Sequence, residues 1–211
     1  MSARSRAATF TIGDNVYVGI GSSPKGSYTK DFWEYDAVSN SWSQKADFAG
    51  TGRELAVGFS IGNKGYIGTG LQGTGYTDPR RDFWEYNPSS NSWLAKADYP
   101  FAIFGAVGFS INGKGYIATG YDWTQLNGDC FEYDVLNNKW TPNSATTGRY
   151  AATCFTIGNK AYIGNGDKSF FKQDQMQTRD FYEFDPAIKT WTQLTPFGGK
   201  GRHLHWLAKD M

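Results

Sequence analysis

Short apolar runs alternate with turn residues along the chain. In residues 57–68, two apolar runs, each with an aromatic residue, flank Gly62-Asn63-Lys64. Gly and Asn tolerate the positive φ of tight hairpins, so this stretch predicts two antiparallel strands. A third run, Asp82-Phe-Trp-Glu-Tyr-Asn87, and a fourth around Trp93 follow after further turn residues. Turn signals at this spacing predict an all-β chain.

This unit of four runs occurs four times. We call the predicted strands of one unit a, b, c and d. Strand a carries Phe10, Phe59, Phe109 or Phe155; strand b carries Tyr17, Tyr66, Tyr116 or Tyr162; strand c carries Glu34, Glu85, Glu132 or Glu183; strand d carries Trp42, Trp93, Trp140 or Trp191. Repeats of about 50 residues with four strands each are typical of β-propeller blades. We predict a single domain, 1–211, with blades at about 4–49, 50–100, 101–146 and 147–195 and a tail, 196–211, that resembles the start of a fifth.

The repeated aromatic residues are predicted to be structural. Both faces of a blade pack against neighbouring blades, so its strands need apolar residues on both sides. The strand-b tyrosines and strand-d tryptophans would therefore lie between blades. The strand-c glutamates need a hydrogen-bond partner where they are buried, and backbone groups or a nearby Lys or Arg are the expected partners.

Charge and composition exclude several classes of function. Lys and Arg number 21 and Asp and Glu 20, a net charge of +1, so we expect no nucleic-acid or membrane partner. The chain shows neither an apolar run of membrane-spanning length nor a signal peptide, and it leaves the compartment undetermined. Cys130, Cys154, His203 and His205 are too few and too scattered for a metal centre. We predict no metal and no cofactor.

The repeats resemble those of the kelch family. Arg4, Arg53 and Arg149 occupy the family's basic position before strand a, and the strand-b tyrosine, the Tyr-Asp that ends strand c and the strand-d tryptophan recur with them. There are two departures: Ile103 replaces the third basic residue, and only the second glycine of the usual Gly-Gly doublet after strand b is present. The variant looks most like bacterial, often secreted, kelch repeats, which implies a secreted or periplasmic parent protein.

Loop lengths indicate where a ligand would bind. The a–b and c–d turns have constant length in the four units, whereas the b–c loops and d–a links vary. In an up-and-down sheet the variable connections share one face, and loops on a rigid scaffold commonly carry recognition. The candidate ligand-binding residues on this face are Arg53, Tyr76, Tyr121, Trp123, Arg149, Tyr150 and Phe170. The kelch resemblance implies acidic-peptide contacts for Arg53 and Arg149; the competing interpretation is an ion pair with the next blade.

These features predict a non-catalytic scaffold that binds a protein, a peptide or a carbohydrate. One alternative is a sugar mutarotase or epimerase, which requires acidic and basic groups to converge at the channel mouth. Another is an assembly module without a ligand of its own. Kelch rings usually have six or seven blades, so four units predict a partial ring or half of one, from a truncated or engineered protein. We expect either two copies in an eight-blade ring, the favoured form, or one strained four-blade disc.

Overall fold

The four repeats form four separate antiparallel sheets. The computed structural model describes residues 2–73, 78–168 and 177–201. Blade 1 contains β1 (Ala8–Ile12), β2 (Asn15–Gly19), β3 (Phe32–Asp36) and β4 (Ser41–Lys45); blade 2 contains β5 (Val57–Ile61), β6 (Lys64–Gly68), β9 (Phe83–Asn87) and β10 (Ser92–Lys96). Blade 3 contains β11 (Val107–Ile111), β12 (Lys114–Ala118), β13 (Cys130–Asp134) and β14 (Lys139–Pro142); blade 4 contains β15 (Thr153–Ile157), β16 (Lys160–Gly164), β17 (Phe181–Asp185) and β18 (Thr190–Leu194). A two-stranded ribbon, β7 (Leu71–Gln72) with β8 (Asp78–Pro79), lies in the b–c loop of blade 2.

Register repeats from blade to blade as the sequence predicts. The strand-a Phe pairs with the strand-b Tyr in every blade, as Phe10 does with Tyr17, and that Tyr pairs with the strand-c Glu. Positive φ angles occur in the two short turns, for example 57° at Gly62 and 45° at Asn91. The turn residues therefore set the register, because they supply the left-handed backbone that tight hairpins require.

Each strand-c glutamate has a tyrosine hydroxyl as its partner. The strand-b tyrosines donate to these carboxylates, at 2.8 Å for Tyr66 to Glu85 and 2.9 Å for Tyr162 to Glu183. A lysine also pairs with each glutamate, as Lys96 does with Glu85. Burial and the hydrogen bond to Glu85 raise the pKa of Tyr66. The expected lysine partner is present, but the tyrosine of the neighbouring strand was not anticipated.

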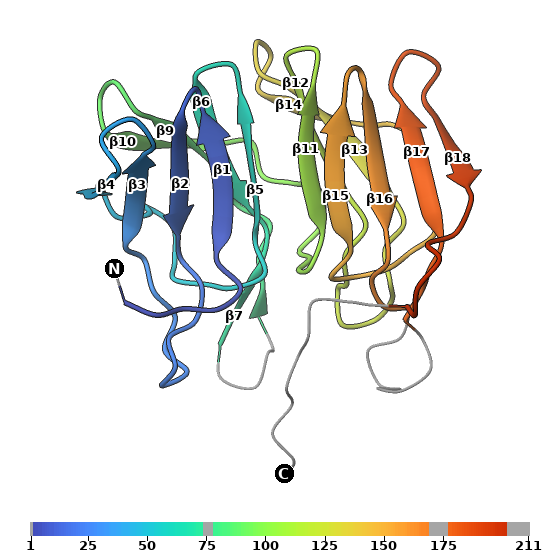
Figure 1. Cartoon of the computed structure of the whole chain (residues 1–211), viewed down its shortest axis with the longest axis horizontal. Coiled ribbons are helices and arrows are strands. Elements are labelled where there is room, and N and C mark those ends of the chain that lie inside the picture. Colours follow the sequence, from blue (N-terminus) through green and yellow to red (C-terminus); the bar gives the residue numbers. More distant parts are fainter. Residues whose placement is uncertain (1, 74–77, 169–176, 202–211) are drawn as a thin grey trace.

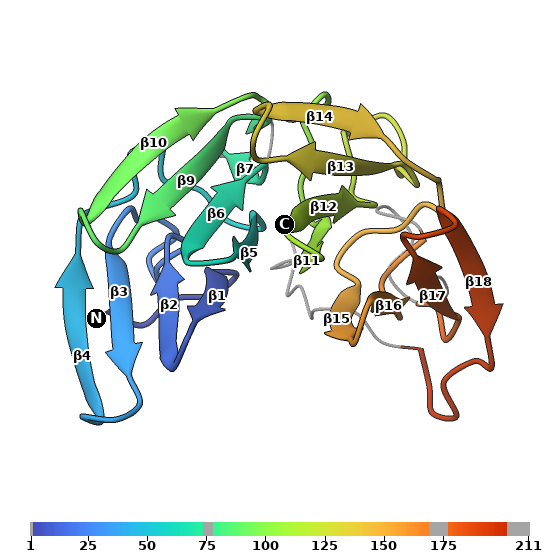
Figure 2. The ribbon, with the colours of Figure 1, turned by 90° about the horizontal axis from the view of Figure 1, so that it is seen from above.

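The blades stand side by side in an open arc (Figure 2). Their a strands lie innermost and their d strands outermost, with β1 against β5, β5 against β11, and β11 against β15. Among the described residues, no strand of blade 1 contacts a strand of blade 4. The predicted all-β propeller with a partial ring is confirmed, and the alternative of a closed four-blade disc is wrong.

The described residues contain no helix that could cross a membrane.

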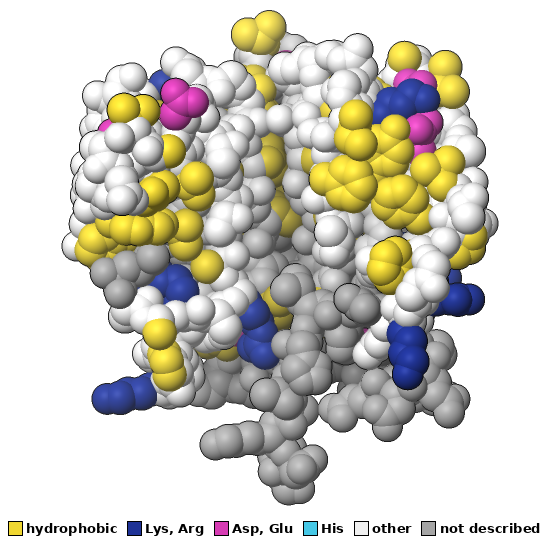
Figure 3. Space-filling view, viewed as in Figure 1, with side chains coloured by type: hydrophobic (Ala, Val, Ile, Leu, Met, Phe, Trp, Pro, Cys, Tyr) yellow, Lys and Arg dark blue, Asp and Glu magenta, His cyan; other side chains and the backbone are white. Residues whose placement is uncertain are grey.

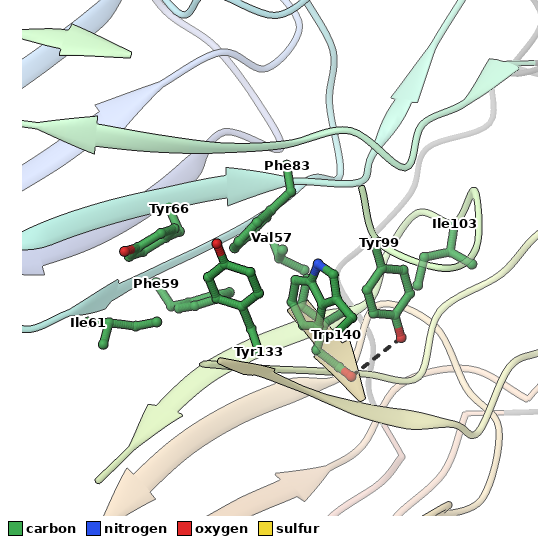
Figure 4. Close-up of a cluster of buried hydrophobic side chains, with 10 residues drawn as sticks. Val57, Phe59, Ile61, Tyr66, Phe83, Tyr99, Ile103, Tyr133 and Trp140 are labelled. Carbon is green, nitrogen blue, oxygen red and sulfur yellow. Dashed lines mark hydrogen bonds between the residues drawn. The ribbon is translucent and has the colours of Figure 1, made fainter. Parts of the chain in front are cut away.

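Aromatic rings fill the inner junctions between blades. Between blades 2 and 3, Phe83 lies 4.9 Å from Tyr133 and 5.0 Å from Trp140, ring centre to ring centre (Figure 4). Tyr99 packs on the other side of Trp140 at 5.1 Å and donates its hydroxyl to the carbonyl of Ile117. Burial of rings of this size makes these junctions a main source of stability.

The four strand-d tryptophans do not share one environment, contrary to expectation. Trp93 and Trp140 lie at inner junctions, and Trp191 stacks on Phe184 at a ring distance of 4.8 Å. Trp42 is 45% exposed. At the inner junctions the strand-d tryptophan packs against the preceding blade, as Trp93 does on Phe32, but no described blade precedes blade 1. Position in the arc therefore decides its burial.

Substitution of Gly65 tests how closely the blades approach. A Cβ on Gly65 would lie 2.0 Å from the ring of Phe10 in blade 1. We expect Gly65→Ala to lower the free energy of unfolding by about 1 to 3 kcal/mol, the usual cost of overpacking. Urea unfolding would measure it. Gly198→Ala is the control, since its new Cβ would contact nothing within 4 Å. Equal stability of the two variants would contradict close packing at this junction.

Candidate functional site: the mouth of the channel

The variable connections gather at one end of the arc. The b–c loops and d–a links lie at the lower end in Figure 1, and the a–b and c–d turns lie at the upper end. Backbone pairing joins the two kinds of connection directly: Glu54 bridges to Leu71, Phe104 to Tyr121, and Tyr150 to Asp167. Figure 3 shows several Lys and Arg side chains toward this lower end. The two variable connections thus form one surface.

A chain of backbone hydrogen bonds links the d–a links around the axis. Arg6, Leu55, Gly105 and Ala151 occupy equivalent positions before strand a, with φ angles of 55°, 56°, 62° and 54°. The N–H of Leu55 donates to the carbonyl of Arg6 at 3.2 Å, that of Gly105 to Leu55 at 3.0 Å, and that of Ala151 to Gly105 at 2.8 Å. Because strand a is the innermost strand, these residues lie along the axis of the arc at its lower end, which we call the channel mouth.

An acidic and a basic side chain meet at this mouth. Nη1 of Arg6 lies 2.9 Å from Oε1 and 3.0 Å from Oε2 of Glu54, although the residues belong to different blades. The Glu54 side chain is 1% exposed and that of Arg6 is 17% exposed. A buried carboxylate requires such a partner. Arg6 is thus the less buried partner of the pair.

Arg53 and Arg149, two predicted ligand contacts, point into their own blades. Nη2 of Arg53 lies 2.7 Å from Oδ2 of Asp82, and Nη1 also pairs with Asp82. Arg149 binds both carboxylate oxygens of Asp180, at 2.8 and 3.1 Å. Both arginines are buried, and blade 1 repeats the pattern with Arg4 and Asp31. Both arginines thus form ion pairs, but within their own blades and not with the next blade as the competing interpretation had it.

The paired arginines favour the ionised form of these aspartates. Burial opposes ionisation of Asp180, but hydrogen bonds from Arg149, Thr178 and Lys168 lower its pKa to about 2. In blade 3, where Ile103 replaces the arginine, the equivalent Asp129 is exposed. An aspartate at this position is thus partly buried where an arginine forms an ion pair with it, and exposed where the arginine is missing.

The predicted aromatic residues cluster, but most of them are covered. Tyr121 and Tyr150 are 4% and 8% exposed and pack with Phe104 and Leu55. Trp123 is partly exposed on this cluster, with its ring 5.1 Å from that of Phe104. Burial, Asp167 and Tyr121 raise the pKa of Tyr150 to about 12, so its phenol is neutral at ordinary pH. Tyr76 and Phe170 lie outside the described residues, as do His203 and His205.

The sequence-based prediction missed Arg6, Glu54 and Asp167. Arg6 lies two residues after the basic position of blade 1, and Glu54 lies one residue after that of blade 2. Asp167 is 2% exposed and directly follows Gly166, the glycine that comes after strand b. At the Glu54 position the four units carry Ser5, Glu54, Phe104 and Tyr150. This divergence at one structural position, within otherwise constant repeats, is the sequence feature that could have indicated a functional residue there.

Several known proteins resemble this chain, although no family model matches it. The N-acetylneuraminate epimerase of Haemophilus influenzae (strain PittEE) is 38% identical over 85 residues, covering 39% of this chain and 22% of that protein. The N-acetylneuraminate epimerase of Escherichia coli O9:H4 (strain HS) is 28% identical over 182 residues, covering 85% of this chain and 44% of that protein. Kelch-like protein 25 of Xenopus tropicalis is 25% identical over 224 aligned positions, covering 98% of this chain and 35% of that protein. The chain spans less than half the length of each of these relatives.

Relatives named as epimerases overturn the expectation that this protein is non-catalytic. They favour the alternative of a sugar epimerase on a propeller scaffold.

A solved structure supports the fold independently. The structure of YjhT matches with a TM-score of 0.79 at 20% identity, covering 94% of this chain and 67% of that one. The likeness agrees with the repeated four-stranded sheets and with the similarity to Kelch-like protein 25. The repeated residues, the four-stranded blades and these likenesses together support a kelch-type β-propeller fold for this chain.

Proposed function

We propose that the channel mouth of this chain binds an acidic sugar and contributes to its epimerisation. The observation that carries the proposal is the Arg6–Glu54 pair, because it brings a positive charge and a carboxylate to the axis of the arc. The names of the relatives supply the substrate class, since N-acetylneuraminate is a sugar that carries a carboxylate. The chain matches only part of those proteins, so residues outside this chain would complete the site.

Arg6 is assigned the role of binding the sugar carboxylate. A guanidinium matches a carboxylate in geometry and charge, and the contact is stronger where the site excludes water. Glu54 acts as a positioning residue, because its two hydrogen bonds hold the Arg6 side chain at the mouth. Trp123, the most exposed aromatic residue of the neighbouring cluster, offers a flat surface to the C–H face of a sugar ring.

Epimerisation at an anomeric carbon needs no second reactant. In ring opening, the bond between the anomeric carbon and the ring oxygen breaks, the anomeric hydroxyl becomes a carbonyl, and its proton moves to the ring oxygen. Closure on the other face of the carbonyl re-forms the carbon–oxygen bond and returns the proton. A carboxylate and a neutral phenol are suitable groups for such transfers. Asp167 and Tyr150 from blade 4 bring these two groups to the same end of the arc.

Arg6→Gln is expected to weaken binding of N-acetylneuraminate by about tenfold or more, the usual loss on removing a charged hydrogen bond. Saturation-transfer NMR would measure binding, and exchange between the anomer signals would measure turnover. Arg6→Lys should retain part of the affinity. The methyl ester of the sugar, which lacks the charge, should bind the parent chain as weakly as the acid binds Arg6→Gln.

Arg81→Gln is the matched control, because Arg81 is an exposed arginine paired with Asp98, away from the axis. It should bind like the parent chain. The proposal fails if the sugar acid does not bind, or if Arg6→Gln and Arg81→Gln bind it equally.

A further inference from the structure

The three junctions inside the arc are not held closed in the same way. At the junction of blades 1 and 2, Nε1 of Trp93 donates to the carbonyl of Ala46 at 3.1 Å, and Oδ1 of Asn91 accepts from the N–H of Ala46 at 2.9 Å. The junction of blades 2 and 3 repeats both bonds, at 2.9 Å each. We call this Asn–Trp arrangement the peptide clamp. It ties the outer strand of one blade to the chain that leaves the preceding blade.

The junction of blades 3 and 4 lacks the clamp. Lys189 stands where the other blades have asparagine. The N–H of Ser144, which occupies the position of Ala46, donates to Oδ1 of its own neighbour Asn143 at 2.9 Å. Nε1 of Trp191 is buried and has no hydrogen-bond partner among the described residues. Blade 4 is therefore not tied to blade 3 at this point.

Two of the aromatic rings found at the other junctions are also missing from this one. Trp93 packs against Phe32 at 4.9 Å and against Phe48 at 5.1 Å, ring centre to ring centre. At the junction of blades 3 and 4, the equivalent positions carry Cys130 and Thr146. The hydroxyl oxygen of Thr146 is buried and also has no partner in the part of the chain that the structure describes. Small side chains and unsatisfied polar atoms weaken the outer contact between these blades.

The inner edge of the same junction is joined as firmly as the others. This edge is formed by the a strands (Figure 2), and β11 lies against β15 there. The N–H of Ala151 donates to the carbonyl of Gly105 at 2.8 Å, and that of Gly120 donates to the carbonyl of Arg149 at 2.7 Å. The equivalent bonds at the other junctions measure 2.7 to 3.2 Å. Blades 3 and 4 are thus joined along the axis and weakly held at the rim of the arc.

A hollow marks the rim on the blade-3 side of blade 4. Its volume is about 570 Å³, and Tyr182 and Gln193, which pair across β17 and β18, are part of its lining. The Tyr182 hydroxyl lies 3.1 Å from Oγ1 of Thr147, in the link that leaves blade 3. At the junction of blades 1 and 2 the equivalent residue, Trp84, packs against the ring of Phe48. Open space is therefore present at this rim where another junction has packed rings.

We propose that blade 4 swings about its inner edge and opens the rim of its junction with blade 3. The backbone bonds at the axis form the hinge, and the rim lacks the clamp and the rings that hold the other junctions closed. Such hinge motions use the contacts of lowest stability in a structure. The motion would turn Tyr150 and Asp167 relative to the other three blades. Neither the hinge nor the rim includes Arg6 or Glu54, so the inference does not depend on the proposed sugar site.

The two cysteines of the chain are natural probes of this junction. Cys130 lies on β13 of blade 3 and Cys154 on β15 of blade 4, and both belong to the apolar cluster between these blades. Cys130 is 2% exposed. Burial raises the pKa of both thiols, which keeps them unreactive while the junction is closed. Modification of Cys130 by a thiol reagent therefore reports opening.

The test is the rate at which a thiol reagent labels Cys130 of the whole chain in low urea, followed by mass spectrometry. The open fraction calculated from this rate should exceed the unfolded fraction, measured by circular dichroism, at least about tenfold. Hydrogen exchange in β16 and β17 should report a smaller open fraction than the labelling does, because blade 4 moves as a unit.

Restoring the clamp should keep the junction closed. Lys189→Asn combined with Asn143→Lys introduces the residues that both clamped junctions carry at these positions. Asparagine also tolerates the left-handed φ of 52° at position 189 better than lysine does. The double variant should slow the labelling of Cys130 by about tenfold or more, the effect of two added hydrogen bonds.

The control for the restored clamp is Asn143→Lys combined with Lys139→Asn. It has the same composition but restores no clamp, because Lys139 is an exposed residue at the start of β14. It should label at least as fast as the parent chain. Circular dichroism would verify that both variants are folded, and the measurements on the parent chain need no substitution.

Three results would overturn the proposal. One is an open fraction at Cys130 no larger than the unfolded fraction. Another is hydrogen exchange in β16 and β17 that matches the labelling, since blade 4 would then unfold instead of swinging. The third is equal labelling of the restored-clamp variant and its control, which would show that the missing clamp does not determine the opening.

Discussion

Substitution of Trp140 by alanine is expected to lower the free energy of unfolding by about 3 to 5 kcal/mol, the range for large aromatic residues in protein cores. Trp140 is 8% exposed, packs between Phe83 and Tyr99, and donates Nε1 to the carbonyl of Ala97. Its removal leaves a cavity between blades 2 and 3 and a carbonyl without its donor. Urea unfolding, at a concentration where the chain is monomeric, would measure the loss.

Trp42→Ala is the matched control for this prediction. The two tryptophans share strand position and register, but the Trp42 ring is half in solvent. We expect its loss to cost less than about 1 kcal/mol, as surface substitutions usually do. Comparable losses for the two variants would show that packing between blades does not determine the stability of the arc.

Substitution of Arg53 by isoleucine is expected to cost about 3 kcal/mol, the lower end of the range for breaking a buried ion pair. Arg53 is 1% exposed, whereas the Asp82 side chain retains 31% exposure, so solvent relieves part of the loss. Isoleucine is the residue that blade 3 carries naturally at this position. The double variant Arg53→Ile/Asp82→Asn should recover part of the stability, because no buried charge is left unpaired.

The same pair predicts a change in acid sensitivity. Burial opposes ionisation of Asp82, but hydrogen bonds from Arg53 hold its pKa below the ordinary value of 3.8. The stabilisation is thus complete above that value and is lost as pH falls below it. In Arg53→Ile, unfolding free energy should depend less steeply on pH in this acid range. Stability measured in citrate and phosphate buffers would test this, with Asp129→Asn in the exposed blade-3 position as an unaffected control. An unchanged slope in Arg53→Ile would contradict the assigned role.

Many features of the fold could be predicted from local residues. Gly62 and Asn91 supply the left-handed backbone of the two short turns, and those turns set a register that pairs Tyr66 with both Phe59 and Glu85. The placement of the variable loops on one face also followed, because antiparallel strands return to the same end. These properties depend on residues within one repeat of about 50 residues, and the sequence contains four such repeats.

The proposed sugar site is less predictable. The family's basic position suggests ligand contacts for Arg53 and Arg149, but Asp82 and Asp180 hold them inside the blades. The pairing of Arg6 with Glu54 is not predictable from the repeats, because 48 residues separate the two and neither residue recurs in the other units. Their contact depends on the backbone hydrogen bonds that join neighbouring blades around the axis, such as that from Leu55 to Arg6. No single repeat contains these bonds.

Each blade can be derived from its own residues: four strands, their register, two short turns and apolar side chains on both faces. The physical reason is that turn chemistry and strand pairing are local, so each repeat encodes them completely. Which tryptophan is buried and which charges face the axis depend on how the blades are arranged in space. Those outcomes depend on which blade stands next to which, and the end blades of an arc have one neighbour instead of two.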